Sequence, residues 1–282
     1  MDFSKLSNVN NRDFNLTSSS STTFKTQDFH AHTFYEILYF KGGDVQYYME
    51  DNSYSLVAGD VLIIPPNTMH RPVVIDQRRS YDRMVMELSQ EYCRRLMQRI
   101  GDCFLWKELK PCRISVDHLG ASQFIDYMDR LMELPGDDRG YLERDSICTL
   151  LLLLIDHTLS RNLTAAETSP QQIHEILRYI NAHFTQTLHL DEIADRFYLS
   201  KFHLLRQFKS YTNCTIHDYI LTKRIQLAKA LLTDGMSAGE VGDACGFASY
   251  ASFYQAFHKR TGFSPSGYTT DADEAEHLQE PQ

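Results

Sequence analysis

The 282-residue chain has no run of apolar residues long enough to cross a membrane. A membrane-spanning helix needs about 20 consecutive apolar residues, and the longest candidate run, Leu150 to Ile155, is far shorter and is bounded by Asp145 and Asp156. The N-terminus is polar, with an Asn- and Ser-rich run through Ser21 and no signal-peptide pattern. We therefore expect a cytoplasmic protein with no membrane partner.

The sequence also lacks the patterns of a disulfide framework or a catalytic site. Its six cysteines show no closely spaced pairs, so we expect reduced thiols. They are Cys93, Cys103, Cys112, Cys148, Cys214 and Cys245. No nucleophile motif and no phosphate-binding glycine loop is present. We predict no enzyme activity, no catalytic residue and no cofactor.

No segment is strongly basic, and the formal net charge is -9. Residues 170 to 270 carry 10 Lys and Arg against 8 Asp and Glu, whereas the tail from Asp271 carries five acids and no base. Residues 170 to 270 are thus the one positive segment, and only weakly so. Any binding of nucleic acid there should depend more on base contacts or dimerisation than on bulk charge.

Two helices joined by a tight turn are predicted between Ser237 and Tyr268. An apolar stripe at helical spacing (Val241, Ala244 and Cys245) ends at Gly246, a residue suited to the left-handed conformation. Ser249 is a good N-cap for the second helix. Its inward face is Phe253, Ala256 and Phe257, and its outward face is Tyr250, Ala251, Tyr254, Gln255 and His258, with Lys259 and Arg260 at its end. Such a face suits reading of the DNA major groove, although alone it also fits an ordinary helical hairpin.

The same plan occurs upstream. Ile193, Ala194 and Phe197 line one helix, Leu199 fills the corner and Ser200 caps a second helix whose inward residues are Leu204 and Phe208. The outward residues are Phe202, His203, Leu205, Arg206 and Lys209. The pattern of residues 216 to 233 predicts one long helix between the two copies. Two recognition helices joined by one rigid helix could enter successive major-groove segments about 34 Å apart.

These residues resemble the DNA-binding domain of the AraC/XylS family of transcription factors. The matching residues include Leu190, Ile193, Ala194, Ser200, Leu204, Arg206, Phe208, Lys209, Tyr219, Arg224, Ala228, Leu231, Leu232, Gly246, Phe247, Ser249, Phe253, Phe257, Gly262, Pro265 and Tyr268. The resemblance implies two helix-turn-helix units whose second helices read DNA. The implied DNA-binding residues are Ser200, Phe202, His203, Leu205, Arg206, Lys209, Ser249, Tyr250, Ala251, Tyr254, Gln255 and Lys259. Asn213-Cys214, Gly242 and Thr269 depart from the family pattern.

Residues 24 to 88 have the pattern of many short strands separated by turns, which predicts a small β-barrel. The expected strands are 34–40, 45–50, 54–57, 61–64, 72–75 and 81–88. The sequences HAHTFYEILYFKGG and GDVLIIPPNTMH resemble the two motifs of the cupin barrel. In that resemblance His30, His32, Glu36 and His70 match the metal-binding positions. Sensor domains of this regulator family often resemble cupins without holding a metal, so we expect no metal here.

The ligand-binding residues that we predict are His30, His32, Glu36, Tyr47 and His70. On a strand, positions 30, 32, 34 and 36 share one face, so these side chains could point into the barrel. Three His and one Glu can hold a divalent transition metal, or the same side chains can bond a small polar ligand or one another. Tyrosine hydroxyls such as that of Tyr47 would suit a sugar, although strand tyrosines are more often ordinary core or surface residues.

From Gln90 to Arg161 the apolar residues recur at helical spacing, which predicts three helices. The run Leu150 to Ile155 is apolar on all sides, so we expect it to be buried, either within one chain or against a second subunit. Residues 162–170 read as a linker and residues 271–282 as a disordered acidic tail.

The predicted fold class is a multidomain α+β protein. Its parts are a disordered segment (1–23), a cupin-like β-barrel sensor (24–88), a helical dimerisation region (89–161), a linker (162–170), an all-α double helix-turn-helix domain (171–270) and the tail. We predict a transcription regulator, an activator by resemblance. Its partners would be double-stranded DNA, a small polar effector such as a sugar, RNA polymerase and a second copy of the chain. The alternative is a metal-dependent cupin enzyme, an isomerase or dioxygenase, fused to a DNA-binding module.

Overall fold

The computed structural model describes most of the chain and divides it into two compact units. The described residues are 9–11, 13–22, 27–100, 109–115, 121–135, 138–161 and 172–268. The N-terminal unit comprises residues 1–26, 34–66 and 72–167, and the C-terminal unit comprises residues 168–282 together with two short segments, Gln27–Thr33 and Asn67–Arg71. The linker 162–170, the tail 271–282 and Thr269 lie outside the described residues.

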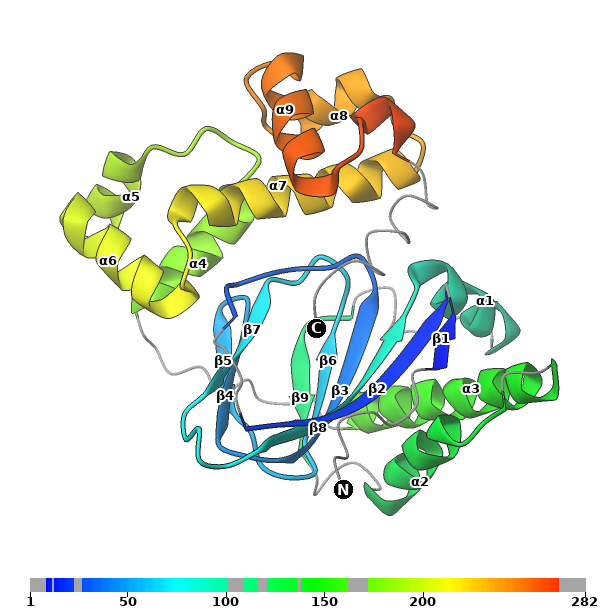
Figure 1. Cartoon of the computed structure of the whole chain (residues 1–282). Helices are drawn as coiled ribbons and strands as arrows, with labels where there is room; N and C mark the ends of the chain where they lie inside the picture. The colour runs from blue at the N-terminus through cyan, green and yellow to red at the C-terminus, as the bar shows by residue number, and fades with distance from the viewer. Residues whose placement is uncertain are drawn as a thin grey trace. The chain divides into compact units, whose positions relative to one another are not determined.

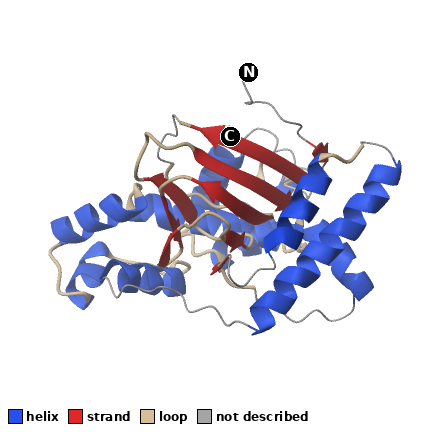
Figure 2. Ribbon diagram, turned by 90° about the horizontal axis from the view of Figure 1, so that it is seen from below, coloured by secondary structure: helices blue, strands red, loops and turns tan. Residues whose placement is uncertain are grey.

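The N-terminal half contains two β-sheets (Figures 1 and 2). The larger has the order β1-β2-β8-β3-β6-β9, and the smaller has the order β5-β4-β7. The strands are β1 (Val9–Asn11), β2 (Phe14–Ser21), β3 (Tyr35–Gly42), β4 (Val45–Met49), β5 (Asn52–Ser55), β6 (Val61–Ile64), β7 (His70–Val74), β8 (Tyr81–Leu88) and β9 (Cys112–Ile114). The predicted strands 61–64 and 81–88 have the predicted bounds, and the other four lie within a few residues of theirs.

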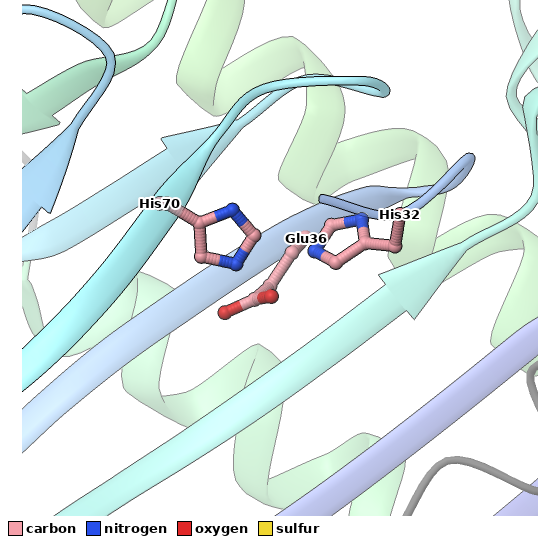
Figure 3. Close-up of side chains that lie close together, drawn as sticks. All are labelled: His32, Glu36 and His70. Atoms are coloured by element: carbon pink, nitrogen blue, oxygen red, sulfur yellow. The ribbon is translucent and has the colours of Figure 1, made fainter. Parts of the chain in front are cut away.

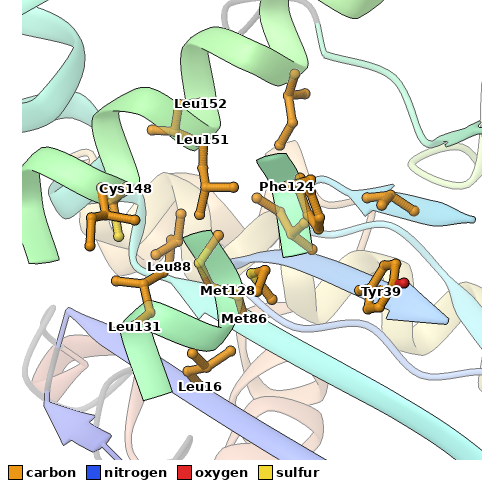
Figure 4. Close-up of a cluster of buried hydrophobic side chains, with 14 of the residues drawn as sticks. Leu16, Tyr39, Met86, Leu88, Phe124, Met128, Leu131, Cys148, Leu151 and Leu152 are labelled. Carbon is orange, nitrogen blue, oxygen red and sulfur yellow. The ribbon is translucent and has the colours of Figure 1, made fainter. Parts of the chain in front are cut away.

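The larger sheet is buried on both faces, because successive side chains of a strand point to opposite sides. On one face Ile37 and Tyr39 of β3 pack with the helices of residues 90–161 (Figure 4). On the other face Leu38 and Phe40 pack with residues of the smaller sheet, including Tyr47. Glu36 has the same strand parity as Leu38, which puts it on the face toward the smaller sheet.

Two strands correct the sequence predictions. Residues 1–23 were expected to be disordered, but Phe14–Ser21 form β2 and pair with β8 along their whole length. Phe14 and Leu16 are buried in the core, so tertiary burial outweighs the low strand propensity of the serine run. The region 89–161 was expected to be helical, but it also contributes β9, which pairs with β6.

Three helices cover the outer face of the large sheet. They are α1 (Gln90–Ile100), α2 (Ala121–Met132) and α3 (Asp138–Arg161). Leu151, Leu152 and Ile155 of α3 are buried in this core, as predicted, but Leu150 is 45% exposed and Leu142 is 68% exposed. The expectation that the whole apolar run is buried was therefore wrong for Leu150.

The C-terminal unit consists of helices arranged around one long helix. The helices are α4 (Gln172–His183), α5 (Leu190–Arg196), α6 (Lys201–Thr212), α7 (Ile216–Thr233), α8 (Ala238–Ala244) and α9 (Tyr250–Thr261), followed by the short η2 (Pro265–Gly267). In Figure 1, α4 to α6 lie at one end of α7, and α8 and α9 lie at the other. The bounds of α7 are those that the sequence predicted. Among the described residues, no helix is both long and apolar enough to span a membrane.

Arg224 of α7 fixes the loop between α4 and α5. Its Nε donates to the carbonyl of Phe184 (2.7 Å) and its Nη2 donates to that of Gln186 (2.8 Å). Gly246, the left-handed residue between α8 and α9 (φ 79°), packs against Thr185 of the same loop. Helix α7, the loop between α4 and α5, and the turn between α8 and α9 therefore hold one another in place.

Candidate functional site

The first helix-turn-helix comprises α5 and α6. Ser200 caps α6, because its side chain accepts a hydrogen bond from the amide of His203 (3.2 Å). Leu204 and Phe208 are buried, which fixes the rotation of α6 about its axis. Asn213 ends the helix in the left-handed conformation (φ 63°), which Asn adopts more readily than most residues, so this departure from the family pattern keeps a left-handed helix end.

The second helix-turn-helix comprises α8 and α9. Ser249 caps α9 in a capping box with Ser252, and Gly262 ends the helix at φ 77°. Phe253 and Phe257 are buried with Val241 and Cys245 of α8. Ala244 was expected in this apolar stripe but is exposed, because Val241 and Cys245 alone fill the i, i+4 face.

All twelve residues predicted to bind DNA are solvent-exposed. Those of the first helix-turn-helix are Ser200, Phe202, His203, Leu205, Arg206 and Lys209. Those of the second helix-turn-helix are Ser249, Tyr250, Ala251, Tyr254, Gln255 and Lys259. Phe202 is the most exposed of the large apolar ones at 73%, and Tyr250 and Tyr254 follow at 46% and 40%. These residues face solvent because the opposite faces of α6 and α9 carry the buried side chains.

Neighbouring side chains restrain several of these groups. The Arg206 guanidinium lies 3.3 Å from Nδ1 of His203 and 5.8 Å from the centroid of the Phe202 ring. The Tyr254 ring stacks on His258 at a centroid distance of 6.0 Å. Arg260, which the sequence grouped with Lys259, instead contacts Thr222 and Asp218 of α7. Lys259 is thus the basic residue at the end of α9 that remains a candidate for phosphate contact.

Tyr198 is a surface residue that the sequence reasoning missed. It occupies the left-handed region (φ 55°) in the turn before α6, and 97% of its surface is exposed. A bulky residue in this conformation is strained and is enriched at functional sites. Its position in the turn between α5 and α6 corresponds to that of Gly246 in the turn between α8 and α9. Comparing the two helix-turn-helix sequences could therefore have predicted that Tyr198 is left-handed.

A buried polar cluster is formed by residues of β3, of β7 and of the segment before β3 (Figure 3). His32, Glu36 and His70 each offer a ligand atom, and these atoms all lie within 4.8 Å of one another. The three residues are 6%, 8% and 0% exposed. The predicted strand 34–40 corresponds to β3, which begins at Tyr35, so His30 and His32 lie before the strand and do not share a strand face with Glu36. His32 nevertheless approaches Glu36 because the chain bends between them.

Hydrogen bonds define the chemistry of this cluster. Nδ1 of His70 lies 2.8 Å from the carbonyl of Thr68, which favours a proton on Nδ1 and leaves Nε2 as an acceptor or metal ligand. Burial, with the Glu36 charge and a hydrogen bond to Glu36 adding to it, raises the pKa of the Tyr47 hydroxyl well above its usual value. Tyr47 therefore stays protonated and donates to the Glu36 carboxylate.

His30 stands slightly apart from the cluster. It forms an isolated β-bridge with His70, and the two rings lie 4.3 Å apart between centroids. Its Nδ1 lies 3.0 Å from the carbonyl of Asp28. The structure thus brings the five predicted ligand-site residues into one neighbourhood, with His32, Glu36 and His70 as the group whose spacing suits a divalent transition metal.

Known protein families match both halves of the chain. Residues 193–271 match the helix-turn-helix domain family, and residues 13–104 match the AraC-like ligand binding domain family. Together the two matches span more than half of the sequence.

Individual proteins are also similar to this chain. The "Probable transcriptional regulator LumQ" of Photobacterium leiognathi is 25% identical over 250 residues, covering 88% of this chain and 94% of that protein. The HTH-type transcriptional activator RhaS of Shigella boydii is 26% identical over 253 residues, covering 84% and 85%. The structure of ToxT from Vibrio cholerae has a TM-score of 0.43 and 14% sequence identity, covering 92% of this chain and 98% of that one.

The sequence motifs, the two capped and outward-facing helices and the two family matches agree. The chain belongs to the AraC family of DNA-binding transcription regulators, with a C-terminal helix-turn-helix domain and an N-terminal ligand-binding domain.

Proposed function

We propose that this regulator activates transcription when a small polar molecule, such as a sugar, binds to His30, His32, Glu36, Tyr47 and His70. The observation that carries the proposal is the buried polar cluster within 4.8 Å, in the domain that matches ligand-binding domains. Burying two histidines and a carboxylate is costly unless polar partners compensate them. Hydroxyl groups of a ligand could exchange hydrogen bonds with all three.

An effector could act on the DNA-binding helices through the segment that carries His32. Gln27–Thr33 groups with the C-terminal unit, and the carbonyl of Ala31 accepts a hydrogen bond from the side chain of Gln226 on α7 (2.8 Å). A ligand that holds His32 differently would change the stability of this contact. It can shift the equilibrium only by its different affinities for the two arrangements.

The first test is a selection of random duplex DNA on the purified full-length protein at near-physiological salt. Enrichment of two short boxes about one helical turn apart is expected if both α6 and α9 read bases. Enrichment of one box would mean that one unit serves as scaffold. No enrichment with the full-length chain would contradict this proposal.

The effector is tested by thermal-shift screening of sugars and other small polar compounds. Glu36→Gln keeps the size of the side chain and an oxygen that can accept from Tyr47, but it removes the charge. We expect this variant to lose the shift caused by a true effector. The surface variant Glu133→Gln is the matched control, and a shift retained by Glu36→Gln would argue against a ligand at this cluster.

We also propose that the protein forms a homodimer through the outer face of α3. Leu142 (68% exposed) and Leu150 (45% exposed) lie two helical turns apart on that face, with Ser146 between them. Sedimentation of Leu142→Glu/Leu150→Glu should show monomer at micromolar concentration, whereas Val57→Glu, a change at another exposed apolar residue, should not. Monomeric wild-type protein, with and without DNA, would refute the dimer.

RNA polymerase and the cytoplasmic location belong to the same proposal. An activator bound at a promoter works by recruiting or remodelling polymerase, and in bacteria, the source of the relatives named above, promoter DNA lies in the cytoplasm. A transcription assay with purified polymerase, with and without the selected sites, tests this directly.

A second candidate function is supported by the same cluster. Two histidines and a carboxylate are a ligand set that non-haem metal enzymes use, and His32, Glu36 and His70 would hold the ion. Metal analysis of the purified protein decides: iron, manganese or zinc at one per chain, lost in His32→Ala, would favour a metal-dependent protein. The surface variant His157→Ala should keep any such metal.

A further inference from the structure

Phe202 and Leu205 form an apolar surface on the first reading helix. They lie one turn apart on α6, within its first two turns after the Ser200 cap. Phe202 is 73% exposed and Leu205 is 37% exposed. Leaving a phenylalanine in water forgoes the stabilisation that burial of such a side chain brings. Their placement on the outward face of a DNA-reading helix gives this surface a use.

The second reading helix presents different chemistry at the same positions. Both helices begin at a serine cap, and both bury the fourth and eighth residues after it: Leu204 and Phe208 in α6, Phe253 and Phe257 in α9. At the second, fifth and sixth positions α6 has Phe202, Leu205 and Arg206, whereas α9 has Ala251, Tyr254 and Gln255. The two recognition helices are therefore alike in geometry but differ in the side chains that they present to base edges.

Basic groups surround the apolar surface of α6. Arg206 lies 5.8 Å from the centroid of the Phe202 ring, and Lys209 is exposed one turn further along the helix. An apolar patch bordered by cations fits a partner that has apolar groups beside negative charge. In the major groove the one apolar group that a base offers is the 5-methyl of thymine, and the phosphates lie alongside.

We propose that α6 reads thymine methyl groups through Phe202 and Leu205, next to a guanine bound by Arg206. The half-site of the first unit is then a thymine-containing box recognised by apolar contact. The half-site of the second unit is recognised more by hydrogen bonds from Tyr254 and Gln255. This inference rests on the proposed reading of DNA by both helices and names what the first of them recognises.

Deoxyuridine substitution tests the proposal, because it removes only the 5-methyl group of a thymidine. The probe is the most enriched duplex from the DNA selection, with each thymidine replaced in turn and binding of the full-length protein measured at fixed salt. Burial of one methyl group corresponds to about a three- to fivefold change in Kd. We expect a loss of that size at one or more thymidines of the α6 box.

The variants assign the effect to its side chains. Phe202→Ala or Leu205→Ala should bind thymidine and deoxyuridine duplexes equally at the affected position. Lys209→Ala, a matched change on the same helix, should weaken binding to both duplexes and keep their ratio. Both side chains are exposed, so these variants are expected to fold, which circular dichroism checks.

Two results would overturn the inference while leaving DNA reading intact. One is equal affinity for thymidine and deoxyuridine duplexes at every position of the α6 box. The other is a deoxyuridine effect that persists in both alanine variants. Absence of any enriched sequence would instead mean that the proposed DNA reading itself fails, so the two failures are distinguishable.

Discussion

Gly246→Ala is predicted to be one of the most destabilising single-methyl changes in the DNA-binding unit. A Cβ at this position would lie 1.9 Å from the carbonyl oxygen of Thr185, and the backbone is left-handed (φ 79°). The loop cannot withdraw easily, because Arg224 binds the carbonyls on both sides of Thr185. Gly235 provides a matched control, since it is also left-handed (φ 89°) but a Cβ there would meet nothing within 4 Å.

The magnitudes follow from these two environments. A left-handed L-residue costs about 1–2 kcal/mol, and this term applies to both glycines. Forcing an extra group against packed backbone adds about 1–3 kcal/mol. Gly235→Ala should therefore lower the free energy of unfolding by about 1–2 kcal/mol, and Gly246→Ala by about 2–5 kcal/mol.

Urea unfolding followed by far-UV circular dichroism measures both losses, and hydrogen exchange shows whether α8 and α9 are the helices that open. Combining Gly246→Ala with Arg224→Lys should reduce the penalty of the glycine change, because the loop is then freer to move. Equal losses for Gly235→Ala and Gly246→Ala would refute the argument that contact with Thr185 matters.

Three further predictions concern recognition and titration. Arg206→Ala should relax preference at one or two base pairs, whereas Lys209→Ala should weaken all sequences alike; equal losses on every sequence for Arg206→Ala would make it a phosphate contact. Burial raises the pKa of the Cys148 and Cys245 thiols to about 12, so both should resist a thiol reagent at pH 8 until urea unfolds the protein; rapid native labelling detected by mass spectrometry would contradict this. Burial also raises the pKa of Tyr35 to about 12. The tyrosine of the unfolded chain titrates at about pH 10, so the free energy of unfolding should fall as the pH rises above that value. A urea midpoint at about pH 10.5 that equals or exceeds the midpoint at pH 8 would refute the raised pKa of Tyr35.

Much of the C-terminal unit could be predicted because its signals are local. Ser200 and Ser249 cap helices, Gly246 and Gly262 are left-handed, and the apolar spacing of residues 216–233 marks one helix. Caps and left-handed turns depend on neighbouring residues only, so a single sequence is enough to place them. Exposure of the reading residues follows, since the opposite helix faces are apolar.

The N-terminal half shows where local signals fail. The serine run in β2 is a strand only because β8 pairs with it and the helices bury Phe14 and Leu16. Likewise, His32, Glu36 and His70 converge through a bend before β3 and through the start of β7, a strand of the other sheet almost forty residues after His32. The restraint on Gly246 comes from a loop that Arg224 holds across the unit. The sequence by itself determined the capped, outward-facing helices through short-range periodicity, whereas long-range pairing and burial decided which polar groups meet, because those contacts exist only once the chain has folded.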